Sequence, residues 1–406
     1  MSMIQKEQQQ SKYVNMATDV GDHAFMFFAV VAFASVAVMI NPVSFSYFVT
    51  TLVYESDSLF ANASVFTDNE HDVTPAVAHL PTPQPLKAVY MTSWVAGTPH
   101  IRARVIDLID TTEINSVIID IKDDTGKISF LPHNELLKEY GAGTNRIADI
   151  DALLALLHEK NIYVIGRVSV FQDPHLALAR PELAVSRASD GAPWHDRKGL
   201  AWLDVGGLST WDYVVAIARE SYARGFDEIN FDYVRFPTDG NTNDMFFPFS
   251  QGRRRDIALE EFFSYLAYTL EDDPFPISAD FFGLVTTQDD DMGIGQVLER
   301  ALPYFDYVAP MVYPSHFGKG VYGIANPAED PYQTVYRAMS SAVTRAINAS
   351  TTPAKLRPWL QDFNLGADYT AEMVRAQIDA TYDTGLTSWM LWNPANTYTK
   401  SALLTR

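Results

Sequence analysis

The sequence predicts an α/β protein whose main part is a (β/α)8 TIM barrel, preceded by a transmembrane helix and a proline-rich spacer. Two observations support this prediction. Residues 87–406 contain eight apolar runs that alternate with helical patterns, as expected for eight βα units. Residues 24–40 are 17 apolar or small residues without a charge, a length near the lower limit for crossing a bilayer.

The amino-terminal apolar segment is expected to anchor the chain in a membrane. Lys6 and Lys12 precede it, and no Lys or Arg follows until Lys87. The positive-inside rule therefore places residues 1–23 in the cytoplasm, residues 24–53 in the membrane and the remainder outside the cytoplasm. A cleaved signal peptide is the main alternative and would make the protein secreted. A buried core helix is the third interpretation.

Residues 54–86 are expected to form a disordered spacer. They are acidic, contain no basic residue, and carry prolines at positions 75, 81, 83 and 85. This composition favours an extended chain that buries little apolar surface. The barrel domain is therefore expected to cover residues 87–406.

The eight predicted strands are rich in β-branched, aromatic and aliphatic residues. They cover residues 87–94, 116–123, 162–171, 226–237, 276–283, 304–314, 356–363 and 386–394. Helical patterns separate them at residues 100–112, 147–160, 211–224, 257–270, 293–302, 331–348 and 370–384. Strands that alternate with helices form parallel sheets. Eight such units predict a closed barrel, although a doubly wound open sheet would have the same order of elements.

Strand alternation predicts which charged side chains point into the barrel. In each strand the apolar residues of one parity face the helices, which leaves Asp120, Lys122, Arg167, Asp232 and Asp280 pointing inward. All five lie at or near the carboxyl ends of their strands, where barrel active sites are built. A buried ion pair would explain any one of them, but five charges at one mouth predict a functional site.

Aromatic and amide side chains at the strand ends complete the expected site. Tyr90, Trp94, Tyr313 and Trp392 have the parity of the barrel interior, where flat rings stack on sugars, with ordinary core packing as the alternative for each. Gln361 shares the inward parity of its strand, and Asn393 directly follows Trp392. We therefore expect these residues to bind substrate.

Composition and motifs disfavour other chemistries. The net charge of −20, from 30 basic and 50 acidic residues, disfavours a nucleic-acid partner. Without cysteine there is no thiolate metal site and no cysteine nucleophile. The nine histidines form no metal-binding motif, and neither a nucleophile elbow nor a glycine-rich phosphate loop is present. No metal and no cofactor are expected.

Two inward carboxylates on neighbouring strands are what glycoside hydrolysis requires. We expect Asp232 to be the nucleophile or charge stabiliser, with Arg235 as an electrostatic partner. Asp280 lies beside Phe281 and Phe282, and an apolar setting raises the pKa of a carboxyl group. Asp280 is therefore the expected general acid.

Several of these segments also carry a resemblance to a known family. They are VIIDIKDDTGKISF (117–130), INFDYVRFP (229–237), ISADFFG (277–283), YVAPMVYPSHF (307–317), RPWLQDF (357–363) and WMLWNPANTY (389–398). They resemble the bacterial "putative glycoside hydrolase" domain family over nearly the whole predicted barrel. The resemblance implies an exported or membrane-anchored hydrolase of a sugar polymer.

The arrangement is also similar to the α-amylase-like glycosidases, in which an Asp on the fourth strand is the nucleophile. The resemblance implies this role for Asp232. Their fifth-strand acid is Glu, where this chain has the shorter Asp280. Their third carboxylate lies on the seventh strand, where Asp362 is the candidate, although the inward parity belongs to Trp359 and Gln361.

The sequence thus predicts a membrane-anchored, extracytoplasmic glycoside hydrolase that cleaves a cell-envelope or environmental polysaccharide. One alternative is a non-hydrolytic carbohydrate-binding barrel, which would not need both Asp232 and Asp280. Another is a polysaccharide lyase or transglycosylase that uses Lys122, Arg167 or Tyr313 as its acid–base group.

Overall fold

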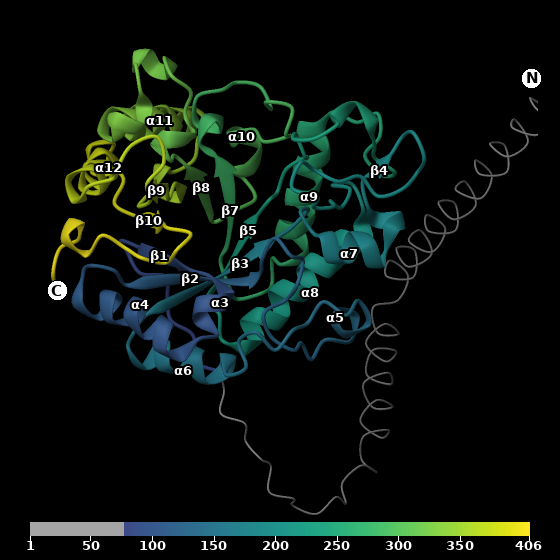
Figure 1. Cartoon of the computed structure of the whole chain (residues 1–406), viewed down its shortest axis with the longest axis horizontal. Coiled ribbons are helices and arrows are strands. Elements are labelled where there is room, and N and C mark those ends of the chain that lie inside the picture. Colours follow the sequence, from purple (N-terminus) through teal and green to yellow (C-terminus); the bar gives the residue numbers. More distant parts are fainter. Residues whose placement is uncertain (1–76) are drawn as a thin grey trace, which may run out of the picture. The chain divides into compact units, whose positions relative to one another are not determined.

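Eight parallel strands close into a barrel at the centre of residues 77–406, the part of the chain that the computed structural model describes (Figure 1). The barrel strands are β1 (Lys87–Met91), β2 (Ser116–Lys122), β3 (Tyr163–Ser169), β5 (Glu228–Asp232), β7 (Ile277–Phe282), β8 (Tyr307–Met311), β9 (Trp359–Gln361) and β10 (Trp389–Trp392). β10 pairs with β1, with Lys87 opposite Trp389. The predicted eight-stranded parallel barrel is therefore confirmed.

Helices follow the barrel strands and form an outer layer (Figure 1). The helices expected from the sequence are α4 (Pro99–Thr111), α6 (Ile150–Glu159), α8 (Leu208–Arg224), α9 (Arg255–Thr269), α10 (Leu298–Ala301), α11 (Pro331–Asn348) and α12 (Ala371–Asp383). Local sequence explains their ends. Asp330 caps α11 by accepting a hydrogen bond from the Gln333 N–H, and Pro331 occupies the first turn. Gly225 ends α8 with a φ of 116°, a conformation that favours glycine.

Short elements in the loops were not expected from the sequence. They include helices α3 (Ser93–Ala96), α5 (Glu135–Glu139) and α7 (Pro174–Ala179), and a small antiparallel pair of β4 (Ser186–Arg187) with β6 (Met245–Phe246). Elements of two to six residues carry too little periodicity to be recognised in a sequence.

Two apolar layers build the core. Val117, Ile119, Phe231 and other residues of one strand parity pack between the barrel and the helices. Residues of the other parity, among them Ile118 and Trp359, fill the barrel interior. A buried ion pair closes the amino-terminal end of the interior, where the Arg357 Nη1 lies 2.9 Å from Glu228 Oε2.

The ordered domain starts before Lys87, so the predicted spacer boundary is too late. The Leu80 N–H donates to Asp227 Oδ1 at 2.8 Å, and the Thr82 and Tyr163 hydroxyls lie 2.9 Å apart. Leu86 is fully buried in the barrel interior. Residues 77–86 therefore pack on the barrel, which their proline content did not reveal.

The remaining amino-terminal predictions concern residues outside the described part. These are the cytoplasmic segment 1–23, the anchor or signal peptide at 24–53, and residues 54–76 of the spacer. Within residues 77–406, no helix has both the length and the apolar character needed to cross a membrane.

Candidate active site

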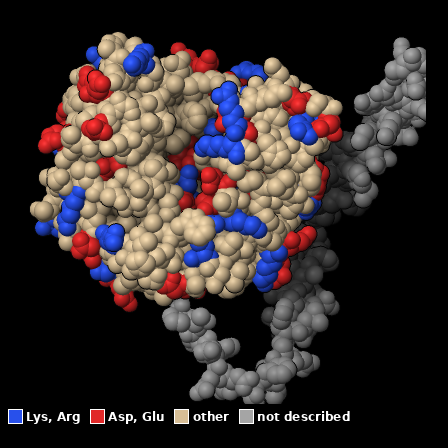
Figure 2. Space-filling view, in the orientation of Figure 1, with Lys and Arg blue, Asp and Glu red and all other residues tan. Residues whose placement is uncertain are grey.

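A cavity of about 560 Å³ opens at the carboxyl ends of the barrel strands. The space-filling view shows a hollow near the centre of the molecular face, with acidic and basic side chains inside it (Figure 2). The cavity is lined by Arg167, Lys198, Asp232, Tyr233, Arg235, Asp280, Phe282, Gly283, Leu284, Met311, Tyr313, His316, Phe317 and Trp392. This is the end of a TIM barrel at which catalysis takes place.

Arg167, on β3, joins the inward carboxylates into one network. Its Nη1 donates to Asp120 Oδ1 at 2.6 Å, and its Nε donates to Asp232 Oδ2 at 3.1 Å. The same Nε lies 3.8 Å from Asp280 Oδ2. Burial opposes the charge of Arg167, but the Asp232 and Asp120 carboxylates outweigh burial and raise its pKa well above the ordinary value. Arg167 is therefore a permanent cation between three carboxyl groups.

Asp232 ends β5 in a conformation that fixes its carboxylate. Its Oδ2 accepts hydrogen bonds from the Nε and Nη2 of Arg167. Its Oδ1 accepts the backbone N–H of Tyr233 at 2.5 Å. Tyr233 has a φ of 53°, which is uncommon for a residue other than glycine and is typical of functional sites. The turn after β5 thus holds Asp232 at the cavity wall.

Asp280, on β7, is a buried carboxyl group with a strongly raised pKa. Burial and, next, the charge of Asp232 raise its pKa to about 8. The Trp359 Nε1 and Asn230 Nδ2 both donate to its Oδ1, at 2.7 and 3.0 Å. Because Oδ1 is already an acceptor for two N–H groups, the proton of the neutral form lies on Oδ2. A pKa of about 8 favours the protonated form of Asp280 at neutral pH, so this group can donate a proton.

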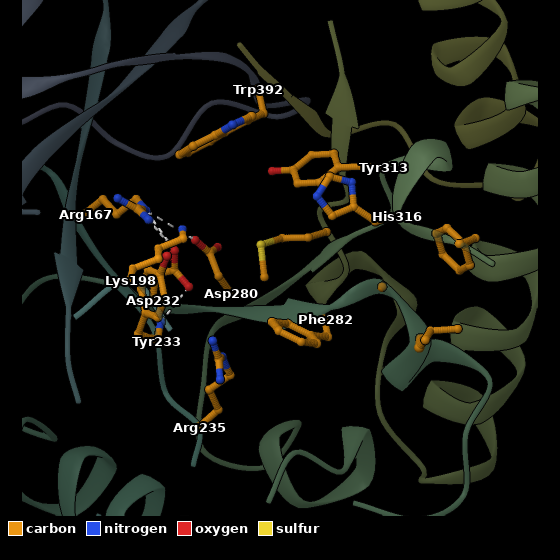
Figure 3. A pocket seen from close by; sticks show the side chains of 14 residues that line it. Arg167, Lys198, Asp232, Tyr233, Arg235, Asp280, Phe282, Tyr313, His316 and Trp392 are labelled. Carbon is orange, nitrogen blue, oxygen red and sulfur yellow. Dashed lines mark hydrogen bonds and ion pairs between the residues drawn. The ribbon is translucent and has the colours of Figure 1, made fainter. Parts of the chain in front are cut away.

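Aromatic rings form the cavity walls (Figure 3). Figure 3 shows Trp392 above the carboxylates, Tyr313 and His316 across from them, and Phe282 below. Tyr90 stacks on Trp392 with ring centroids 3.9 Å apart, and its hydroxyl donates to Asp120 Oδ2 at 2.5 Å. Trp392 and Tyr313 therefore line the cavity, whereas Tyr90 and Asp120 support it from behind.

Two predicted binding residues lie elsewhere. Lys122 is fully buried against Asp173, with the Nζ 2.5 Å from Oδ2, and its ammonium faces the Tyr213 ring on α8 at 5.1 Å. An irregularity in the β2–β3 register between Asp120 and Lys122 breaks the alternation, so Lys122 points toward the helix layer. Trp94 lies on α3, is 64% exposed, and packs under the Arg146 guanidinium at 4.3 Å.

Three further predicted residues, Gln361, Asp362 and Asn393, hold loops and do not line the cavity. Gln361 accepts the Ser315 N–H at 3.1 Å and so fixes the loop that carries His316. Asp362 accepts the N–H and the hydroxyl of Thr399 at 2.8 and 2.7 Å. The Asn393 Nδ2 donates to the backbone carbonyls of Asp362 and Thr397.

Arg235 lines the cavity, but it is not the ion-pair partner of Asp232. Arg167 has that role, and within residues 77–406 no carboxylate lies within 4 Å of Arg235. Strand geometry explains why Arg167 is the partner of Asp232. Arg167 on β3 lies opposite Asn230 on the neighbouring strand β5, and its side chain reaches Asp232, two residues further along β5.

Sequence reasoning missed the loop residues Lys198, His316 and Phe317 and the roles of Asn230 and Trp359. Strand parity places Asn230 and Trp359 in the barrel interior, but it does not show that both donate to Asp280. Loop residues carry no such signal. Burial lowers the pKa of His316, so its ring is neutral at neutral pH. Residues 77–406 contain no group of three or more His, Asp or Glu side chains placed to hold a metal ion.

Comparison with known proteins adds a family and a fold. The sequence profile described as "Putative glycosyl hydrolase domain" matches residues 88–398. No curated protein matches the chain. Among solved structures, a hypothetical protein from Ruminiclostridium thermocellum is 36% identical over 47% of this chain and 96% of that chain, with a TM-score of 0.44.

Two solved glycosidase structures are more distant in sequence. The PgaB (BpsB) glycoside hydrolase domain from Bordetella bronchiseptica is 13% identical, covering 79% of this chain and 99% of that chain, with a TM-score of 0.57. The α-galactosidase TtGalA from Thermus thermophilus is 14% identical, covering 79% of this chain and 60% of that chain, with a TM-score of 0.48. At such identities the likeness to the Bordetella domain concerns the fold alone.

Proposed function

Because this chain belongs to the family described as the "Putative glycosyl hydrolase domain", we propose that it hydrolyses O-glycosidic bonds in an oligosaccharide or polysaccharide. The observation that carries the proposal is the unequal pair at the cavity. Burial and the Asp232 charge raise the pKa of Asp280 to about 8, which favours its protonated form, whereas the Asp232 carboxylate forms an ion pair with Arg167. An acid and a carboxylate side by side are the requirement of glycoside hydrolysis.

In the proposed reaction Asp280 transfers its Oδ2 proton to the glycosidic oxygen as the bond between that oxygen and the anomeric carbon breaks. The Asp232 carboxylate forms a bond to the anomeric carbon and so replaces the leaving group. Water then attacks the same carbon, gives a proton back to Asp280, and releases Asp232. Trp392 and Tyr313 offer ring faces on which the sugar packs.

The two displacements of the proposed reaction imply retention of anomeric configuration, because each of them inverts the anomeric carbon. The Oδ2 atoms of Asp232 and Asp280 lie 3.1 and 3.8 Å from the same Arg167 Nε, so both carboxyl groups face one region of the cavity. Retaining enzymes hold the groups about 5–5.5 Å apart, whereas inverting enzymes need about 6.5–9.5 Å to admit water. NMR of the first product formed would show the same anomer as the substrate.

The test compares Asp280→Asn and Asp232→Asn with the wild-type, full-length protein. Mass spectrometry of a glycan panel identifies a cleaved polymer, and an aryl glycoside of the same sugar serves as second substrate. Loss of the acid is expected to slow polymer cleavage by about 10²–10⁴-fold, and aryl glycoside cleavage by less. Asp232→Asn should abolish both. If no glycan is cleaved, or if Asp232→Asn retains turnover, the proposal is wrong.

The alternative classes are less well supported by the cavity. Tyr313 lines it, but burial and the Asp280 charge raise the pKa of its phenol well above the ordinary value, so it is a poor base at neutral pH. A lyase or transglycosylase that used Lys122 would need this side chain at the mouth, but Lys122 is buried against Asp173. Arg167 is held by carboxylates on both sides. A binding barrel without hydrolysis has no use for a protonated Asp280.

The cellular location is a separate proposal that rests on the sequence. We propose that residues 24–53 anchor the chain in the membrane, that the barrel lies outside the cytoplasm, and that it acts there on an envelope or environmental polysaccharide. Protease added to intact cells should then degrade the barrel. Protection of the barrel until the cells are lysed would contradict this topology.

A further inference from the structure

Basic side chains are prominent in the lining of the cavity. It is lined by the three cations Arg167, Lys198 and Arg235 and by the carboxyl groups of Asp232 and Asp280, in a protein with a net charge of −20. Arg167 is matched by Asp120 and Asp232. Within residues 77–406, Arg235 and the Lys198 ammonium have no carboxylate within 4 Å. Arg235 and Lys198 are therefore two cations at the cavity that make no direct ion pair in the described part of the chain.

Arg235 is held in place by aromatic rings and is only 9% exposed. Its guanidinium lies 4.7 Å from the Trp202 ring centroid and 4.9 Å from that of Phe282. In the described part of the chain, its only hydrogen bond is from Nη1 to the Phe236 carbonyl at 3.0 Å. A guanidinium has five N–H donors, so most of those of Arg235 remain available at the cavity that it lines (Figure 3).

Within residues 77–406 Arg235 makes no direct ion pair and has only more distant carboxylates, among them Asp232 and Asp196, in contrast to Arg167. Burial lowers the pKa of Arg235 below the ordinary value, whereas neighbouring carboxylates raise that of Arg167. Arginine nonetheless stays protonated in proteins. A buried cation without a partner is costly, and stacking on aromatic rings offsets only part of that cost. Such an arrangement is typical of a site whose partner arrives with the ligand.

Lys198 belongs to a loop that is built to present it. The buried Asp196 accepts the N–H groups of Lys198 and Leu200, both at 2.9 Å. Its other oxygen accepts the Trp202 Nε1–H at 3.1 Å, and the Trp202 ring in turn packs against Arg235. One side-chain network therefore positions both unpaired cations at the same cavity.

We propose that the cavity binds an anionic saccharide, one whose sugar carries a carboxylate, sulfate or phosphate group, and that Arg235 and Lys198 recognise this group. The inference rests on the proposed function and names its substrate class. Arg235 provides the planar donor set that binds such anions through paired hydrogen bonds. Lys198, which is exposed, adds a longer-range attraction.

The test measures binding separately from cleavage. Full-length protein with Asp280→Asn is applied to a glycan array in which the same chains occur in acidic and neutral forms. Uronic-acid oligosaccharides are paired with their carboxyl-reduced forms, and sulfated and phosphorylated chains with unmodified ones, so the anionic group is identified. We expect only acidic chains to be retained. The proposal is wrong if the protein binds neutral chains as strongly as the matching acidic chains. It is also wrong if the protein binds no acidic chain.

Variants then assign the residues. Arg235→Gln, added to the same protein, should weaken binding of the acidic chain by about 10- to 100-fold, as expected for lost charge-assisted hydrogen bonds, without changing residual binding of the neutral chain. Arg104→Gln removes the same charge from an exposed position of α4 and should have no effect. Lys198→Gln should lower the affinity for the acidic chain by a smaller factor than Arg235→Gln. This factor should be larger at low salt than at high salt, because salt screens the attraction.

Two outcomes separate this inference from the proposed function. Cleavage of a neutral chain by the wild-type protein would support hydrolysis and overturn the anionic substrate. If the wild-type protein binds acidic chains but cleaves no chain, the anionic ligand is supported and the proposed hydrolysis is overturned. If Arg235→Gln is misfolded by circular dichroism, the exposed Lys198→Gln still decides the test, since unchanged affinity at low salt contradicts the proposal.

Discussion

The proton of Asp280 couples the chemistry of the cavity to the stability of the fold. The Asp280 carboxyl has an ordinary pKa of 3.8, and in the folded protein the pKa rises to about 8, first because of burial and second because of the Asp232 charge. Between these values the unfolded chain has released this proton and the folded protein has kept it. Raising the pH from about 4 to about 8 therefore favours unfolding.

We predict that Asp280→Asn is more stable than the wild-type protein at neutral pH. Asparagine retains an oxygen for the Trp359 and Asn230 donors but has no proton to lose. The gain in the free energy of unfolding should be near zero at pH 4 and should exceed about 1 kcal/mol at pH 7. Chemical denaturation at several pH values measures it. A gain that is the same at pH 4 and pH 7 would contradict the raised pKa of Asp280.

Trp359 is expected to act on the reaction through Asp280. Its indole N–H donates to Asp280 Oδ1 at 2.7 Å and favours the ionised form, which lowers the pKa of Asp280. Trp359→Phe removes this bond, so the alkaline limb of the kcat/KM profile should move up by about 0.7 pH units, the equivalent of ~1 kcal/mol.

The matched control is Trp389→Phe. Trp389 is also fully buried, but its indole donates to the Tyr382 hydroxyl at 3.0 Å, away from the cavity. Loss of this hydrogen bond in Trp389→Phe should lower the stability of the protein and should not move the alkaline limb of the kcat/KM profile. Equal movement of the alkaline limb in both variants would show that Trp359 has no specific role.

Strand parity was enough to place some site residues and not others. It places Arg167, Asp232 and Asp280 in the barrel because their strands alternate without interruption. It fails for Lys122, because the register irregularity after Asp120 is invisible in the apolar pattern. Lys198 and His316 could not be predicted, since their positions depend on loop hydrogen bonds to Asp196 and Gln361.

The strands and helices themselves were easier to predict than the ends of the domain. Each barrel strand lies within its predicted run, because buried parallel strands read as apolar stretches. The irregularity in β2 is a local departure with a large effect. It turns Lys122 out of the barrel interior, where Asp173 on the loop before α7 compensates its charge.

We predict that Lys122→Met destabilises the protein without changing the site. The substitution leaves Asp173 as a buried, unpaired charge, which typically costs 3–5 kcal/mol, and adding Asp173→Asn should recover part of the loss. Below the unfolding temperature kcat should be unchanged. Lys138→Met, which breaks an exposed pair with Glu135 on α5, should cost at most about 1 kcal/mol. A large loss of kcat in folded Lys122→Met would show that Lys122 contributes to the active site and would contradict this prediction.

The barrel as a unit includes residues that the sequence pattern assigned to the spacer. Segment 77–86 reads as extended and proline-rich, yet Leu80 and Thr82 are hydrogen-bonded to the barrel and Leu86 is buried inside it. Composition alone could not predict that the segment packs on the barrel, because its order depends on three specific contacts and not on its average apolar content.

We predict that a fragment of residues 77–406 is more stable than one of residues 87–406. The shorter fragment loses the Leu80 bond to Asp227 and the fully buried Leu86 side chain. Removal of a buried leucine alone typically costs about 2–5 kcal/mol, which should lower the melting temperature by roughly 5 °C in a chain of this size. Leu86→Ala in the longer fragment should reproduce most of the loss, and Val77→Ala, at an exposed position, should have little effect. Equal melting temperatures for the two fragments would mean that the domain does begin at Lys87.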